Sequence, residues 1–177
     1  LNESKGNIVI SHGYTESLDK YHEIIYYFLK AGFNVFGIEH RGHGRSGSLG
    51  IDDISQMYVE NYEDYISDFK KFMDTVVLPY RNSKKIFLFS HSMGGGIGVR
   101  FIELYPNYFD AAVLSAPMLS LNTGSVPNFI AHALAKAAIA LNRGNVYVIG
   151  FTKYSPEEDM DKWATSSEVR HRYYDNY

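Results

Sequence analysis

The fold is decided by a strand that runs straight into a sharp turn: Lys85-Ile86-Phe87-Leu88-Phe89-Ser90-His91-Ser92-Met93-Gly94. The apolar run is typical of a buried strand, and a helical pattern follows the glycines. A serine on such a turn projects its Oγ above the edge of the sheet, where it can act as a nucleophile. The small residues two positions before and after Ser92, which relieve crowding in the turn, are Ser90 and Gly94. Ser92 is therefore the candidate nucleophile, and the strand and helix around it disfavour an ordinary surface serine.

Strands and helices alternate along the chain on both sides of this turn. Further strands are predicted at 7–11, 33–38 and 111–115, and helices are predicted at 17–31, 59–77 and 96–105. Ser17 is expected to cap the first helix, Gly32 to stop it, and Pro79 and Asn82 to end the second. Such alternation predicts an α/β fold with a doubly wound, mostly parallel sheet.

After Pro117 the alternation stops. Residues 126–141 form an apolar helical pattern, and Val146 to Ile149 is the one further candidate strand. We expect a core at 1–116 and a helical cap or lid at 117–177. The alternative is that the 126–141 helix packs inside the domain.

A second motif, His12-Gly13-Tyr14, follows the first strand. In folds with a serine turn of this kind, one oxyanion-hole amide comes from the residue after the nucleophile and another from the loop after a neighbouring strand. Gly13 allows that loop to bend close. The backbone N–H groups of Met93 and Tyr14 are therefore the predicted oxyanion hole.

The other candidate sites are weaker. The glycine-rich stretch from Glu39 to Gly47 lacks the spacing of a phosphate-binding loop, so Arg41 and Arg45 are expected to brace it against the sheet. His12 and His43 are expected to be structural. His91 is a poor general base because adjacent side chains on a turn point apart. No histidine pair has metal-ligand spacing, so we expect no metal and no cofactor.

Composition narrows the class of protein. The chain has 177 residues, a net charge of −3 and no cysteine, which fits a cytoplasmic globular protein. The mild acidity argues against a nucleic-acid partner, and no apolar run is long enough to span a membrane. The aromatic and basic residues of the tail (Trp163, Arg170, His171, Arg172, Tyr173, Tyr174) leave open peripheral contact with the inner membrane, although ordinary surface is the commoner explanation for such residues.

Three motifs together resemble the serine aminopeptidase-type α/β-hydrolases, within them the lysophospholipase and monoacylglycerol lipase branch. The motifs are His12-Gly13-Tyr14-Thr15-Glu16-Ser17, His40-Arg41-Gly42-His43-Gly44-Arg45-Ser46-Gly47 and Ser90-His91-Ser92-Met93-Gly94-Gly95, and the likeness extends to Ser115-Ala116-Pro117-Met118. Two positions depart from the family pattern: Ser90 replaces the usual Gly, and Glu39 the usual Asp.

The resemblance implies a serine esterase or lipase that cleaves a lipid ester through an acyl-enzyme on Ser92. The triad order in this fold is Ser, then Asp or Glu, then His. No acid or base after Pro117 follows a recognisable strand, so we expect the triad Asp and His to lie outside this chain, as the first strands do before Leu1. The chain alone is then expected to be inactive. A non-catalytic binding protein of the same fold and a proline-iminopeptidase-type peptidase remain alternatives.

Overall fold

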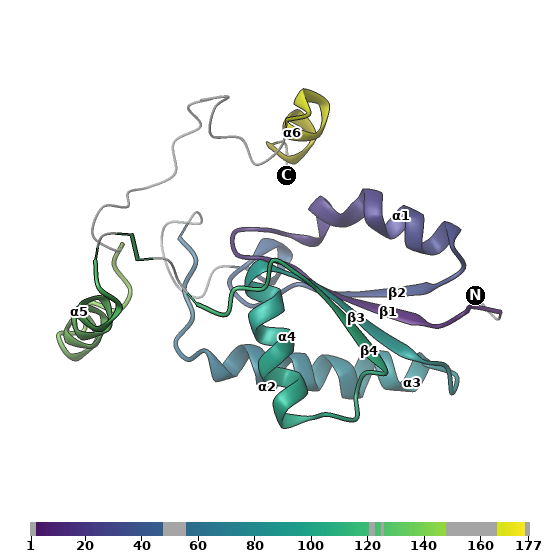
Figure 1. The fold of residues 1–177 in the computed structure, drawn as a ribbon, viewed down its shortest axis with the longest axis horizontal. Helices are drawn as coiled ribbons and strands as arrows, with labels where there is room; N and C mark the ends of the chain where they lie inside the picture. The colour runs from purple at the N-terminus through teal and green to yellow at the C-terminus, as the bar shows by residue number, and fades with distance from the viewer. Residues whose placement is uncertain (1–2, 48–55, 121–122, 125, 148–165, 176–177) are drawn as a thin grey trace.

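The structure is a computed structural model, and it describes residues 3–47, 56–120, 123–124, 126–147 and 166–175. A sheet of four parallel strands has the order β2-β1-β3-β4 (Figure 1). The strands are β1 (Asn7–Ser11), β2 (Asn34–Ile38), β3 (Ile86–His91) and β4 (Ala111–Ser115). The predicted strands and the α/β, doubly wound fold class are confirmed.

Helices cover both faces of the sheet (Figure 1). Helix α1 (His22–Lys30) lies on one face, whereas α2 (Glu63–Phe72) and α4 (Ser92–Leu104) lie on the other. The chain steps from β1 outward to β2, and then crosses back through α2 to β3 on the other side of β1. This reversal places the connecting helices on opposite faces, because each crossover keeps the same hand.

Each face of the sheet has its own apolar core, which explains why β1 is buried at every residue. Ile8 and Ile10 point toward α1, while Val9 points toward α2 and α4, where Phe69 and Phe101 are fully buried. Side chains alternate along a strand with period two, so one strand supplies both cores. Burying each of these large side chains contributes about 1.5–3 kcal/mol.

The first helix begins differently from the prediction. A 3₁₀ turn, η1 (Leu18–Tyr21), precedes α1, and Ser17 makes no side-chain cap hydrogen bond. The Leu18 N–H is instead donated to the Glu39 carboxylate at 2.6 Å. Glu39 comes from the loop after β2, so the cap is a tertiary contact. Gly32 follows the helix at φ +92, in the predicted stop role.

The second helix also departs from the prediction at both ends. It begins at Glu63, where the Asn61 side chain accepts the Glu63 N–H at 3.1 Å. Pro79 does not end it: a π-helical turn, η3 (Met73–Val77), leads into α3 (Leu78–Tyr80), which contains Pro79. A proline in a regular helix clashes with the carbonyl four residues before it, and a wider π turn relieves that clash. Asn82, at φ 50, lies just after α3.

The segment after Pro117 contains α5 (Asn128–Ala140) and α6 (Glu168–Asp175). Helix α5 stands apart from the sheet in Figure 1, and none of its residues is buried. The alternative of a helix packed inside the domain is therefore wrong for this structure. The division into core and cap remains a prediction. The candidate strand Val146 to Ile149 falls partly outside the described residues, and Val146 itself lies in a bend.

Candidate active site

The candidate site lies at the carboxyl ends of the parallel strands. His12 follows β1, Glu39 and His40 follow β2, and Ser92 follows β3. β1 and β3 are neighbours at the point where the strand order reverses. In open α/β sheets, ligands bind outside the carboxyl ends of the strands at this reversal.

Ser92 occupies a strained backbone conformation. Its φ is 49, whereas His91 just before it is extended at φ −129 and ψ 141. A non-glycine residue at positive φ is uncommon, and such outliers concentrate at functional sites. The turn joins β3 directly to α4 without a loop. The local sequence therefore forms the predicted strand–turn–helix with Ser92 at its tip.

The turn needs glycine at position 94 because another backbone segment passes close to it. A Cβ added at Gly94 would lie 2.3 Å from the Ser11 carbonyl oxygen and 2.4 Å from the His12 carbonyl oxygen. Ser90, the other predicted spacer, is fully buried, and its hydroxyl has no hydrogen-bond partner among the described residues.

The loop after β1 approaches the nucleophile closely. A Cβ added at Gly13 would lie 3.1 Å from Ser92 Cβ. The Tyr14 side chain is half exposed, and its N–H has no hydrogen-bond partner among the described residues. Met93 is the second residue of α4, so its N–H has no partner within the helix. The two predicted donors thus lie on segments that meet at Ser92.

Glu16 is a site residue that the sequence reasoning missed as an individual contributor. Its carboxylate accepts the Gly13 N–H at 2.8 Å and the Tyr21 hydroxyl at 2.6 Å, and it pairs with Lys20. Burial alone would raise the pKa of Glu16, but the hydrogen bonds from these three groups outweigh it and lower the pKa. The i, i+3 spacing of Gly13 and Glu16 was the available signal. Thr15, held at φ 55 between them, completes a tight turn.

The contacts of His91 do not place it as a base for Ser92. Its Nδ1 lies 3.1 Å from the Ser115 carbonyl oxygen, and its Nε2 lies 3.7 Å from a Glu16 carboxylate oxygen. Within the described ranges, no hydrogen bond joins Ser92 Oγ to a histidine or a carboxylate. Asp159 and Asp161, acidic residues of the segment after Pro117 that are not assigned to the triad, lie outside those ranges.

Three buried histidines cluster in the loops after β1 and β2. His12 and His40 have ring centroids 4.7 Å apart, and His12 and His43 have centroids 5.3 Å apart. Burial lowers the pKa of all three. They are therefore neutral packing groups at neutral pH, and no group of three potential metal ligands occurs among the described residues.

The loop after β2 is braced by its arginines, but against helices and not against the sheet. Arg41 makes a two-pronged contact with Asp68 of α2 at 2.6 and 2.8 Å, and a third bond to Asp64 at 3.0 Å. Arg45 reaches Asp19 of η1 at 3.2 Å. The expected bracing role is present, and its partners are carboxylates far away in the sequence.

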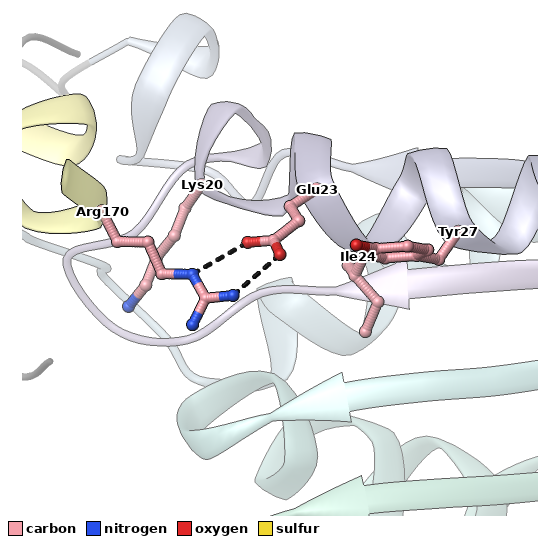
Figure 2. A pocket seen from close by; sticks show the side chains of 5 residues that line it. All are labelled: Lys20, Glu23, Ile24, Tyr27 and Arg170. Atoms are coloured by element: carbon pink, nitrogen blue, oxygen red, sulfur yellow. Dashed lines mark hydrogen bonds and ion pairs between the residues drawn. The ribbon is translucent and has the colours of Figure 1, made fainter. Parts of the chain in front are cut away.

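A separate pocket of about 280 Å³ lies between α1 and α6 (Figure 2). It is lined by Lys20, Glu23, Ile24, Tyr27 and Arg170. Arg170 reaches across to Glu23 through two bonds at 2.8 and 3.0 Å. None of the predicted catalytic residues lines this pocket. Exposed ion pairs of this kind contribute about 0–1 kcal/mol.

Comparison with known proteins agrees with this geometry. A serine turn at the carboxyl edge of a doubly wound parallel sheet defines an α/β-hydrolase. The chain belongs to the family described as serine aminopeptidase, S33, which matches residues 2–176. It is thus a member of a serine hydrolase family that contains esterases and lipases, and the resemblance predicted from the motifs is confirmed.

Two curated relatives are similar over most of this chain. Lysophospholipase L2 of Escherichia coli K12 is 34% identical over 166 residues, which cover 93% of this chain and 48% of that protein. The monoacylglycerol lipase of Mycolicibacterium smegmatis is 31% identical over 138 residues, covering 78% of this chain and 47% of the relative. The chain therefore spans about half the length of these relatives.

A solved structure shows the same fold. The monoacylglycerol lipase of Paleococcus ferrophilus matches with a TM-score of 0.60 at 27% identity, over 76% of this chain and 47% of that one. As to membranes, no helix in the described part of the chain is long and apolar enough to cross one.

Proposed function

We propose that Ser92 is the nucleophile of a serine esterase that cleaves a lipid monoester, either a lysophospholipid or a monoacylglycerol. The observation that carries the proposal is the strained Ser92, at φ 49, with the Gly13-Tyr14 loop packed against it. The lipid substrate class is supported by the names of relatives about 30% identical to this chain. Peripheral contact with a membrane belongs to the same proposal.

In the proposed reaction, Ser92 Oγ attacks the ester carbonyl carbon and loses its proton to a base. The carbonyl electron pair moves onto oxygen, where the N–H groups of Tyr14 and Met93 stabilise it. Collapse releases the glycerol-type alcohol, which takes up a proton, and water then cleaves the acyl-enzyme. One oxyanion donor of this kind supplies roughly 3 kcal/mol of transition-state stabilisation.

The base is proposed to come from sequence corresponding to the half of the relatives that this chain does not match. Without a base at Ser92, we expect this chain to hydrolyse a p-nitrophenyl ester several orders of magnitude more slowly than lysophospholipase L2. Turnover comparable to that relative would contradict the missing base.

The nucleophile itself is tested with a fluorophosphonate probe, which forms a phosphorus–Oγ bond at an activated serine and releases fluoride. Prolonged incubation of this chain is expected to give an adduct on Ser92, located by peptide mass spectrometry. Ser92→Ala should abolish the adduct, while Ser90→Ala, the matched substitution two residues away, should retain it. An adduct that survives Ser92→Ala would defeat the assignment.

A further inference from the structure

The loop that carries the proposed Tyr14 donor is held by an imidazole whose proton position is fixed by its surroundings. The ring of His12 is fully buried, and its Nε2 lies 3.0 Å from the backbone nitrogen of His40. A backbone N–H can only donate, so Nε2 must be the acceptor. Because burial lowers the pKa of His12, the ring is neutral and its single proton lies on Nδ1. Nδ1–H therefore donates to the Gly13 carbonyl oxygen, 2.9 Å away.

That carbonyl and the Tyr14 N–H belong to the same peptide group. The peptide is planar and trans, so its C=O and its N–H point in opposite directions. A donor that holds the Gly13 carbonyl from one side therefore directs the Tyr14 N–H to the other. Glu16 fixes the preceding peptide through the Gly13 N–H at 2.8 Å. Together, His12 and Glu16 hold both peptide groups of Gly13.

We propose that His12 is a positioning residue: its Nδ1–H holds the Gly13 carbonyl so that the Tyr14 amide faces the oxygen that develops charge at Ser92. This role rests on the proposed function of Ser92. A hydrogen bond to the carbonyl also polarises the peptide, which strengthens the N–H at its other end as a donor.

A second branch links the same histidine pair to the nucleophile turn. His40 Nε2 lies 2.9 Å from Ser11 Oγ, and the Ser11 hydroxyl donates to the Gly94 carbonyl at 3.2 Å. Since that hydroxyl proton is used on Gly94, Ser11 Oγ accepts from His40 Nε2–H. The backbone and the ring of His40 thus hold the Tyr14 loop and the turn of Ser92 in one network.

The first test reads the proton position directly, in the wild-type chain and without catalysis. Nitrogen-15 NMR of the imidazoles at pH 7.5 should show His12 protonated on Nδ1 and unprotonated on Nε2, with a slowly exchanging Nδ1–H. A proton on Nε2, or a doubly protonated ring, would overturn the proposal.

The second test separates the two nitrogens with matched variants. The Asn side-chain nitrogen takes the place of Nδ1, so His12→Asn keeps the donor to Gly13. The Gln side-chain oxygen takes the place of Nε2, so His12→Gln keeps only the acceptor for His40. The rate of fluorophosphonate labelling at Ser92 should stay within about 3-fold in His12→Asn and fall roughly 10–100-fold in His12→Gln, somewhat less than complete loss of one oxyanion donor.

A purely structural role predicts a different pattern. In that case the labelling rates would fall in proportion to the loss of stability, measured as the urea midpoint of each variant. Equal labelling rates in His12→Asn and His12→Gln at equal urea midpoints would overturn the proposal. If the wild-type chain forms no adduct, the labelling rates do not bear on His12. The His12 proposal is then decided by the imidazole spectrum and by the Tyr14 amide, whose hydrogen exchange and chemical shift should change in His12→Gln and not in His12→Asn.

Discussion

At the scale of single residues, Gly94 shows how a backbone approach selects an amino acid. Two carbonyl oxygens from the β1 end lie where a Cβ at position 94 would stand, and each would be closer than 2.5 Å. No side-chain rearrangement relieves such a contact, since both atoms belong to the backbone. The same closeness brings the Tyr14 loop next to Ser92, so the glycine serves the site as well as the fold.

Gly94→Ala is therefore expected to destabilise the chain despite lying in a helix. Alanine in place of glycine favours a helix by about 1 kcal/mol, but the backbone clash costs about 3 kcal/mol or more, so we expect a net loss of at least about 2 kcal/mol. Urea unfolding followed by circular dichroism measures this. Gly144→Ala is the control, because its nearest neighbour lies 3.5 Å from the added Cβ. Equal urea midpoints for the two variants would contradict the predicted clash between a Cβ at position 94 and the carbonyl oxygens of Ser11 and His12.

At the scale of elements, the loop after β2 is joined to the helices around it by charged side chains. Arg41 binds α2, and the Glu39 carboxylate caps both η1, through Leu18, and the short turn η2 (Gly44–Ser46), through the Arg45 N–H at 3.1 Å. A guanidinium presents two parallel donors to one carboxylate, whereas an ammonium is a single point charge. Arg41 makes two such bonds, one to each carboxylate oxygen of Asp68.

Arg41→Lys is expected to lower the free energy of unfolding by about 1 kcal/mol, because lysine cannot make the paired bonds to Asp68; partial exposure keeps the loss this small. Arg45→Lys is the matched control. The Arg45 side chain is 81% exposed, and its contact with Asp19 should be worth little. Chemical denaturation measures the free energy of unfolding of both variants. A larger loss of that free energy in Arg45→Lys than in Arg41→Lys would contradict the prediction.

At the scale of the whole molecule, the three buried histidines join the ends of β1 and β2. Burial lowers the pKa of each below the ordinary value of 6.5. His43 also lowers the pKa of His12 and His40, and His12 lowers that of His40, whereas Glu39 and Glu16 raise the pKa of His12 and His43. The net direction for all three is downward, so the folded chain binds fewer protons than the unfolded chain once the pH falls to about 6.5.

The stability from these histidines is thus fully present above pH 6.5 and is lost as the pH falls below it, toward the lower pKa values of the folded state. Each histidine contributes a slope of at most about 1.4 kcal/mol per pH unit. We expect the free energy of unfolding to drop between pH 7 and pH 5.5, measured by urea titration with an unchanged m value. His43→Asn, which can keep the bond to the Arg41 carbonyl, should flatten the dependence. His132→Asn, at an exposed position of α5, should leave it unchanged; a flattening in both variants would contradict this origin of the slope.

The sequence by itself determined the order of strands and helices, the doubly wound class, the turn at Ser92 and the family. These follow from local signals, namely the period of apolar residues, the strand that runs into Ser92, and glycines at fixed offsets. The nucleophile and the two oxyanion amides were predictable for the same reason, since each is tied to a short motif, and their catalytic roles stay a proposal.

Only the tertiary structure decided which residues hold the loops and helices of the fold in place. Glu39 caps η1 in place of Ser17, Pro79 lies inside a helix that adopts a π turn, and His12 receives the His40 N–H. The Glu39 and His12 contacts join residues more than 20 positions apart. Because such contacts depend on how the strands pair and on what each helix covers, no periodicity within one segment specifies them.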